Sequence, residues 1–255
     1  MRPIRLLHTS DIHIGGGFRP PDEGDHHDHC LCPLVVIEQL VADEQIDVML
    51  VVGDLFDHQR VSDDLVDEVL GRLGRLGVPC VVLAGNHDVH DERSVYASGA
   101  PERSGVIFID DHEGTTVELL DGALHLWGKA MAIHDRSFRP LRGLPSRPDP
   151  EAWWVVLGHG HLEHTEDDMY GRSSPVSPAD IEATEADYVA LGHWHVRTDA
   201  STDNVVAWYS GAPYGVAASQ QMNLILLHPE TGVIVSSIPV ELPPEGCFPA
   251  PSPQP

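Results

Sequence analysis

The chain has 255 residues, enough to bury one sizeable core in a single α/β domain. Its 42% hydrophobic content excludes general disorder, and the absence of an apolar run of eighteen residues argues against a membrane span. The formal charge of −25, from 40 acidic and 15 basic residues, repels polyanions and membranes at long range. The first ten residues are too few and too polar for a secretion signal, so a cytoplasmic location is expected.

The first third of the chain alternates between strand and helix patterns. A helix opens at Pro33, and a second, with apolar residues at helical spacing, is capped by Ser62 and ended by Gly77. The predicted elements are strands at 4–9, 47–52 and 78–83 and helices at 33–44 and 63–76. This order is typical of an α/β fold.

The remainder is rich in short strands. They are predicted at 106–109, 115–119, 124–127, 153–157, 188–191, 205–209, 224–227 and 233–238, with a short helix from Ser177-Pro178 to about 184. The Pro- and Arg-rich stretch 136–150 is expected to be an exposed excursion. No linker forces a division, so we expect one domain at 1–242 and a flexible Pro-rich tail at 243–255.

The four cysteines do not have the pattern of a disulfide scaffold. Cys30 and Cys32 are too close in sequence for a good mutual disulfide, and Cys80 lies in an apolar run, where burial is expected. This use of cysteine fits a reducing compartment.

Five clusters of Asp, Asn and His each follow an apolar strand. They are Asp11-Ile12-His13, Gly53-Asp54-Leu55-Phe56-Asp57, Gly85-Asn86-His87-Asp88, Gly158-His159-Gly160-His161 and Gly192-His193-Trp194-His195. In an open α/β sheet the ligand crevice lies beyond the carboxyl ends of the strands, so five such clusters can converge. The D-x-H and H-x-H spacings place both side chains on one side of an extended segment. Imidazole and carboxylate ligands suit Mn, Fe or Zn.

Each cluster also has an ordinary interpretation when taken alone. A single D-x-H is a metal site in roughly one case in ten, Asp57 could be a turn residue, and His161 could be a hydrogen-bonded structural histidine. Their joint occurrence, in order and always at a strand end, has no simple structural explanation. A buried group of so many polar side chains without a metal would be costly.

The clusters resemble the motifs of the calcineurin-like metallophosphoesterases, which run D-x-H, G-D-x-x-D, G-N-H-D/E, G-H and G-H-x-H in this order. The resemblance covers about residues 1–215. The segments HTSDIHIG, GDLFD, GNHD, DYVALGHWH and YSGAP are most similar to the SbcD-type DNA repair exonucleases. The resemblance implies a sandwich of two mixed β-sheets flanked by helices.

The resemblance also implies a two-metal centre, with Mn expected and Fe and Zn as alternatives. Asp11, His13 and His195 would hold one ion, Asn86, His159 and His193 the other, and Asp54 would bridge them. His87 would act on the leaving group and Asp57 would orient it. In the fourth cluster His159 is preferred over His161 because it is nearer the strand end. One departure is Asp57, where some repair nucleases carry a second histidine.

The expected activity is hydrolysis of a phosphodiester by a metal-bridging hydroxide, as in a DNA exonuclease with an ATPase partner subunit. The alternative is a phosphatase or phosphodiesterase acting on small metabolites or nucleotides. The motifs favour the nuclease, whereas the acidity disfavours DNA as a substrate of the isolated chain. Arg136, Arg139, Arg142 and Arg147 form the candidate basic patch, for which exposed solubilising arginines are the alternative. The segment 25–32 could hold a further metal, although a solvated loop is favoured.

Overall fold

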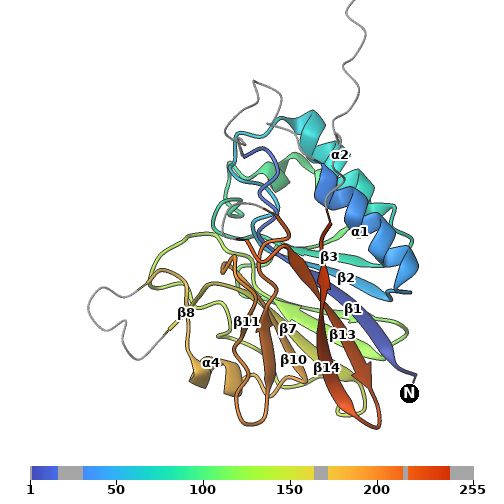
Figure 1. Ribbon diagram of the computed structural model, residues 1–255. Coiled ribbons are helices and arrows are strands. Elements are labelled where there is room, and N and C mark those ends of the chain that lie inside the picture. The colour runs from blue at the N-terminus through green and yellow to red at the C-terminus, as the bar shows by residue number, and fades with distance from the viewer. Residues whose placement is uncertain (1, 17–30, 164–171, 215–217, 242–255) are drawn as a thin grey trace, which may run out of the picture.

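The computed structural model describes residues 2–16, 31–163, 172–214 and 218–241, and in it two six-stranded mixed sheets pack face to face (Figure 1). The first sheet has the order β14-β13-β1-β2-β3-β4, and the second has the order β11-β12-β10-β7-β6-β5. The strands of the first sheet are β1 (Ile4–Thr9), β2 (Val48–Val52), β3 (Cys80–Leu83), β4 (Ile107–Ile109), β13 (Gln221–His228) and β14 (Gly232–Pro239). Those of the second are β5 (Thr115–Leu119), β6 (Leu124–Gly128), β7 (Trp153–His159), β10 (Tyr188–Gly192), β11 (Thr198–Asp199) and β12 (Val206–Tyr209).

Helices cover the outer faces of this sandwich. Helices α1 (Cys32–Asp43) and α2 (Asp63–Gly74) lie on the first sheet, and the short α4 (Pro178–Glu182) lies on the second (Figure 1). The remaining elements are the 3-10 helix η1 (Val95–Ser98), α3 (Ala100–Ser104), and the paired short strands β8 (His161–Leu162) and β9 (Pro175–Val176). The predicted fold class is therefore confirmed.

Strand alternation explains why both faces of the central strands are buried. In β2, Val48, Leu50 and Val52 enter the core between the sheets, whereas Met49 and Val51 enter the core beneath α1 and α2. A third core lies on the outer face of the second sheet. A strand covered on both faces is apolar throughout, which is why β2 could be recognised as a continuous apolar run.

Helix α2 forms for the reasons that its sequence indicates. The Ser62 hydroxyl accepts a hydrogen bond from the backbone N–H of Leu65 at 3.4 Å, and acidic residues occupy the first turn. Such acids interact favourably with the positive end of the helix dipole. The buried face consists of Leu65, Val66, Val69, Leu70 and Leu73.

Several predicted features differ from the structure or lie outside its described part. The strand predicted at 224–227 extends to Gln221–His228, because all eight residues pair with β14. Cys80 is buried as predicted and is free, whereas Cys32 is disulfide-bonded. Most of the His/Cys segment at 25–32 and the tail at 243–255 lie outside the described residues. Among the described residues, no helix combines the length and apolarity that a membrane crossing requires.

Candidate metal centre

The five predicted clusters follow the carboxyl ends of β1, β2 and β3 in the first sheet and of β7 and β10 in the second. Neighbouring strands in each of these groups are parallel, so their ends meet at one edge. His159, the last residue of β7, is the register partner of Gly192, the last residue of β10. The site therefore takes its ligand candidates from both sheets, at the edge where the sheets meet.

One group of candidate ligands consists of Asp11, His13 and His195. One ligand atom from each lies within 4.8 Å of the others. The two histidine Nε2 atoms are 3.3 Å apart, and Asp11 Oδ1 is 3.8 Å from His195 Nε2. Asp11 Oδ1 is buried and has no hydrogen-bond partner among the described residues. A buried carboxylate oxygen without a partner is unfavourable unless a cation binds it.

The second group surrounds Asn86. Its Oδ1 atom lies 3.0 Å from His159 Nε2 and 2.8 Å from His193 Nδ1. Asp54 lies between the groups, with Oδ2 3.4 Å from His159 Nε2 and 3.9 Å from His13 Nε2. The predicted bridging residue thus contacts both sets of candidate ligands.

These distances fit divalent cations. Ligand atoms about 2.0–2.2 Å from one metal ion lie roughly 3.0–3.5 Å from their neighbours in tetrahedral or octahedral geometry. The separations of 2.8–3.9 Å within the two groups are close to this spacing. The mixed nitrogen and oxygen donors suit Mn, Fe or Zn rather than Ca or Mg.

The charges of the site couple Asp54 to His159 and leave His193 neutral. Burial alone would raise the pKa of Asp54, but His159, His13 and the backbone N–H of His87 together lower it below its usual value. Burial lowers the pKa of His159, yet the carboxylates of Asp54 and Asp11 raise it overall. Asp54 and His159 therefore form a buried ion pair without metal. Burial, aided by the charge of His159, lowers the pKa of His193 to about 3, which leaves it neutral, as a ligand must be.

His87 and Asp57 meet in a different way from the one expected. His87 Nδ1 lies 2.7 Å from the backbone carbonyl oxygen of Asp57, and 3.6 Å from its carboxylate. That carboxylate is nearer to His13 Nδ1, at 3.1 Å. Asp57 thus holds the His87 ring mainly through its main chain, while its side chain faces a candidate metal ligand.

Asp88 has a structural role in the site that was not predicted from the sequence. Its buried carboxylate accepts hydrogen bonds from the backbone N–H groups of Gly85, Phe56 and Asp54, at 2.7, 3.1 and 3.2 Å, and from the Tyr96 hydroxyl at 2.6 Å. It therefore holds the second cluster, at Asp54 and Phe56, against the third cluster, at Gly85. In the sequence, only its position next to His87 in the GNHD motif pointed to this role.

The structure also separates His159 from His161. His159 is buried between the two sheets, where Nδ1 lies 2.9 Å from the carbonyl oxygen of Val52 and Nε2 faces Asp54 and Asn86. His161 lies on β8, with its ring centre 6.0 Å from that of His193, and its Nδ1 accepts a hydrogen bond from Trp194 at 3.4 Å. The contacts of His159 favour it as the ligand.

Four of the candidate ligands have backbones in the left-handed region. The φ angles are 55° for Asp11, 52° for His13, 53° for Asp54 and 104° for His193. Each such residue costs free energy, of order 1–3 kcal/mol where the conformation is sparsely populated, and such strain concentrates at functional sites. Close packing adds a further constraint, because a Cβ atom on Gly53 would lie 2.0 Å from His159 Nδ1.

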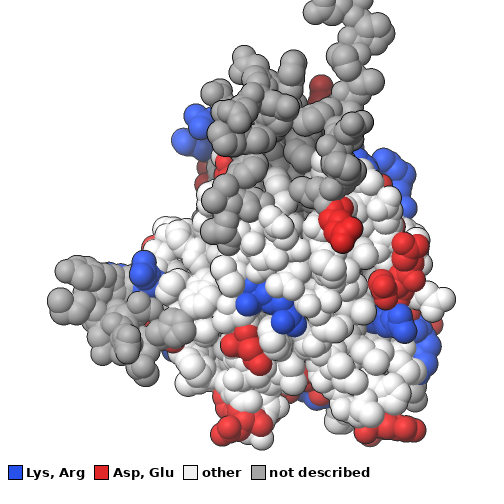
Figure 2. Space-filling model, in the orientation of Figure 1, with Lys and Arg blue, Asp and Glu red and all other residues white. Residues whose placement is uncertain are grey.

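Most arginines of the candidate basic patch are paired with carboxylates of the chain. Three of its arginines form ion pairs with carboxylates of the second half of the chain. The pairs are Arg139–Glu163, Arg142–Asp180 and Arg147–Asp187, at 3.5, 2.8 and 2.8 Å. On the face drawn in Figure 2, basic and acidic side chains are interspersed, and no continuous basic surface is visible. These ion pairs do not favour a free basic patch formed by Arg139, Arg142 and Arg147.

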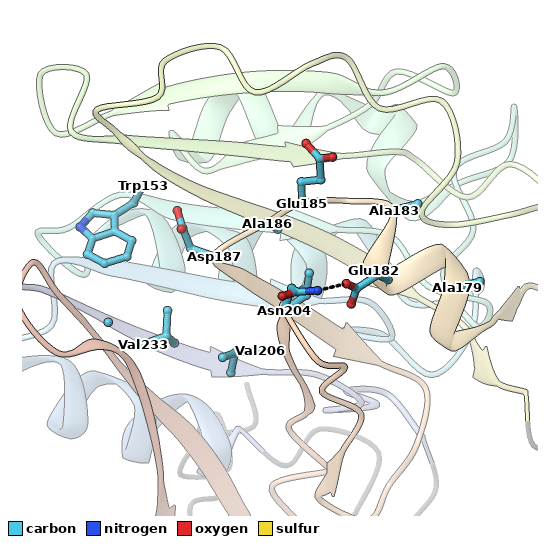
Figure 3. Close-up of a pocket in the computed structure, with 12 residues that line it drawn as sticks. Trp153, Ala179, Glu182, Ala183, Glu185, Ala186, Asp187, Asn204, Val206 and Val233 are labelled. Carbon is cyan, nitrogen blue, oxygen red and sulfur yellow. Dashed lines mark hydrogen bonds between the residues drawn. The ribbon is translucent and has the colours of Figure 1, made fainter.

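A hollow of about 810 Å³ lies elsewhere on the second sheet (Figure 3). It is bordered by Trp153 at the start of β7, by Glu182 and Ala179 of α4, and by Val233 of β14. Because Trp153 and His159 stand at opposite ends of β7, this hollow is remote from the metal centre. Two of its carboxylates have partners, since Glu182 accepts a hydrogen bond from Asn204 and Asp187 binds Arg147.

Comparison with known proteins agrees with this geometry. The family model for calcineurin-like phosphoesterases matches residues 4–197. Similar curated proteins include the SbcD subunit of the nuclease SbcCD from Bacillus subtilis, 27% identical, over 85% of this chain and 63% of that protein. Another is the DNA double-strand break repair protein Mre11 of Methanopyrus kandleri, 26% identical, over 82% of this chain and 49% of that protein. The chain therefore spans less than two thirds of the length of either relative.

Solved structures share the fold at low sequence identity. The protein TT1561 of Thermus thermophilus superposes with a TM-score of 0.57 at 12% identity, covering 91% of this chain and 98% of that one. The calcineurin-like phosphoesterase YfkN of Bacillus subtilis superposes with a TM-score of 0.55 at 11% identity, covering 92% of this chain and 90% of that one. The motifs, the two-sheet fold and the match over residues 4–197 lead to one conclusion: the chain belongs to the calcineurin-like phosphoesterase family.

Proposed function

We propose that the chain is a phosphodiesterase whose active centre holds two divalent metal ions, with manganese as the physiological metal. The observation that carries the proposal is the position of Asp54 between two groups of ligand candidates, 3.9 Å from His13 and 3.4 Å from His159. Asp11, His13 and His195 would hold one ion, Asn86, His159 and His193 would hold the other, and Asp54 would contact both. When bound, the ions supply Lewis acidity, an activated water and compensation for the charge on the phosphoryl group.

His87 is proposed as the acid that protonates the leaving group. Its side chain is 43% exposed, so it is open to a substrate in the crevice. If Nδ1–H donates to the carbonyl oxygen of Asp57, only the protonated ring carries a proton on Nε2 for transfer. The Asp57 carboxylate lies 3.6 Å from Nδ1.

The proposed substrate is a phosphodiester. Two observations bear on whether it is DNA or a small molecule, and they point in opposite directions. Relatives of this chain are named as a nuclease subunit and a DNA repair protein, which supports diester chemistry. The charge of −25 and the internal pairing of Arg139, Arg142 and Arg147 disfavour DNA bound by this chain alone. A basic ATPase partner subunit would supply the missing contacts. A small diester or nucleotide is the second candidate. The proposed location is the cytoplasm.

Metal content provides the first test. Protein purified without chelator and reloaded with Mn²⁺ is expected to contain two ions per chain, as determined by elemental analysis after removal of free metal. The matched control is a His159→Ala and His193→Ala double variant, which is expected to retain at most one ion. A wild-type content near zero after reloading would refute the two-metal centre.

A substrate panel tests the reaction. Mn²⁺-loaded protein is offered bis-p-nitrophenyl phosphate, p-nitrophenyl phosphate, cyclic nucleotides, and single- and double-stranded DNA. Turnover of the diester and weak turnover of DNA are expected. Hydrolysis of the monoester alone would contradict the diesterase and favour a phosphatase.

A further inference from the structure

His134 lies beside the metal centre but belongs to none of the five clusters. It stands in the segment between β6 and β7, and its ring centre is 5.8 Å from that of His193, with the planes inclined by 46°. Burial lowers the pKa of His134, the charges of His159 and His87 lower it further, and that of Asp54 raises it. The ring is therefore within electrostatic reach of the proposed bridging ligand and the proposed acid.

One edge of this imidazole is held by Ser174. His134 Nδ1 lies 3.0 Å from Ser174 Oγ, and Ser174 is fully buried. The single hydroxyl proton can be directed to Nδ1 or to Met131 Sδ, which is 3.9 Å away. If the hydroxyl donates to Nδ1, the better acceptor of the two, the neutral ring carries its proton on Nε2. The protonated ring also has a proton there, so with this arrangement Nε2 is a hydrogen-bond donor in either state.

The backbone around His134 is held firmly. The carbonyl oxygen of Asp135 accepts a hydrogen bond from the Ser174 N–H at 2.6 Å. The Asp135 carboxylate accepts from the N–H groups of Ser137 and Phe138, at 2.7 and 3.2 Å. Although so anchored, the segment presents His134 and Ile133 to solvent, and the Ile133 side chain is 55% exposed. A fixed donor on an open face beside a metal centre is suited to binding an anionic ligand.

We propose that His134 is a substrate-binding residue, whose Nε2–H donates a hydrogen bond to a non-bridging oxygen of the phosphoryl group. This inference rests on the proposed function, because it assumes that a phosphoryl group occupies the crevice. The Ser174 hydroxyl positions the ring, and no proton needs to be transferred. Loss of a hydrogen bond to a charged group weakens binding by about 10- to 100-fold.

Two isosteric substitutions separate this role from a structural one. In His134→Gln the side-chain amide nitrogen can replace Nε2, whereas in His134→Asn the amide can replace only Nδ1 and its contact with Ser174. Inorganic phosphate is titrated into Mn²⁺-loaded full-length protein by calorimetry, with metal content measured in parallel. We expect unchanged metal content, phosphate affinity within a few-fold of wild type for His134→Gln, and about 10- to 100-fold weaker binding for His134→Asn.

The outcomes bear differently on the two proposals. His228→Ala removes an imidazole from the distant end of β13 and serves as the control for loss of a histidine. If His134→Asn binds phosphate like wild type, or better than His134→Gln, the ring only anchors its segment and the inference is wrong. A wild-type protein that holds Mn²⁺ but does not bind phosphate would also overturn it. A wild-type protein that binds phosphate but hydrolyses no diester would refute the proposed function alone.

Discussion

At the scale of single residues, Asp54 and His87 are neighbours in the site with different contacts. Asp54 is buried and faces candidate ligands of both metals, whereas the exposed His87 ring is held by a main-chain carbonyl. Asp54→Ala is therefore expected to lose both bound metal and activity. His87→Ala is expected to keep its metal and lose turnover by about 10²–10⁴-fold, the usual range for a positioned acid or base.

Elemental analysis and diester turnover, measured on the same preparations, check this pair of variants. Asp57→Asn is an informative companion, because the main-chain carbonyl that binds His87 remains. A modest loss of activity is expected there. Equal metal content in Asp54→Ala and His87→Ala would show that their roles have been assigned wrongly.

A second residue-scale prediction concerns His8, which is fully buried between the sheets. Its Nδ1 lies 2.8 Å from the Tyr188 hydroxyl, and burial lowers its pKa to about 3. The unfolded chain takes up this proton near pH 6.5 and the folded chain only near pH 3. As the pH falls below about 6.5, the free energy of unfolding should therefore decrease, by up to about 1.4 kcal/mol per pH unit for this group.

Denaturant unfolding of chelator-treated protein between pH 5 and 7 measures this slope. Other histidines with lowered pKa contribute to it, so the share of His8 is the difference between the wild type and His8→Gln. The variant is expected to bind about one proton fewer on unfolding. His228→Ala should retain the wild-type slope, and an unchanged slope in His8→Gln would contradict the assignment.

At the scale of the elements, the end of β10 is packed so closely that only glycine fits. A Cβ atom on Gly192 would lie 2.0 Å from the Val52 carbonyl oxygen and 2.7 Å from His159 Nδ1. Gly192→Ala must push the two sheets apart at the site. The expected result is a stability loss of about 1–3 kcal/mol, typical of overpacking, together with reduced metal content.

Gly71→Ala is the matched control, because this helical position in α2 is close only to the flexible end of Arg75, at 3.1 Å. It should stabilise the protein by roughly 0.5–1 kcal/mol through helix propensity. Thermal unfolding and elemental analysis of both variants give the comparison. Normal metal binding in Gly192→Ala would show that the strand ends have more freedom than their packing indicates.

The elements that were predictable are those whose apolar pattern is continuous and buried. Strands β1, β2, β7 and β10 agree with their predicted ranges to within two residues at each end. The short elements η1, α3, β8, β9 and β11 were not predicted. They are two to five residues long, which is too short for a periodic apolar pattern to be recognised.

The convergence of the candidate ligands could be predicted from the sequence, but their detailed contacts could not. Each ligand candidate follows a strand with a clear apolar pattern, so the convergence of Asp11, Asn86 and His193 could be inferred from the general geometry of α/β sheets. The carbonyl contact of Asp57, the anchoring by Asp88 and the proximity of His134 depend on loop conformation. Such positions have no periodic signature in the sequence.

At the scale of the whole molecule, charge decides which substrates the chain can approach. The net charge is −25, and the arginines of the candidate patch are largely paired with carboxylates. The isolated chain is therefore expected to bind double-stranded DNA weakly and with strong dependence on salt. Fluorescence anisotropy between about 50 and 200 mM salt measures this dependence.

A small diester provides the control for the same preparation, because its turnover needs no contacts outside the active centre. Its rate should change much less with salt than the cleavage of DNA does. Tight DNA binding at physiological salt without a partner would contradict the proposed division between small and polymeric substrates.

The order of the strands along the chain has a consequence for synthesis on the ribosome. The second sheet is made from one continuous stretch between Thr115 and Tyr209, whereas the first combines strands at 4–109 with the hairpin of β13 and β14. Strand β1 pairs with β2 on one side and with β13 on the other. During translation, all ligand candidates up to His195 leave the ribosome before β13 does. At that stage one edge of β1 still lacks its pairing strand. The nascent chain thus exposes an unpaired strand edge until Gln221–His228 has left the exit tunnel, and this interval is when mispairing with another chain is most favourable.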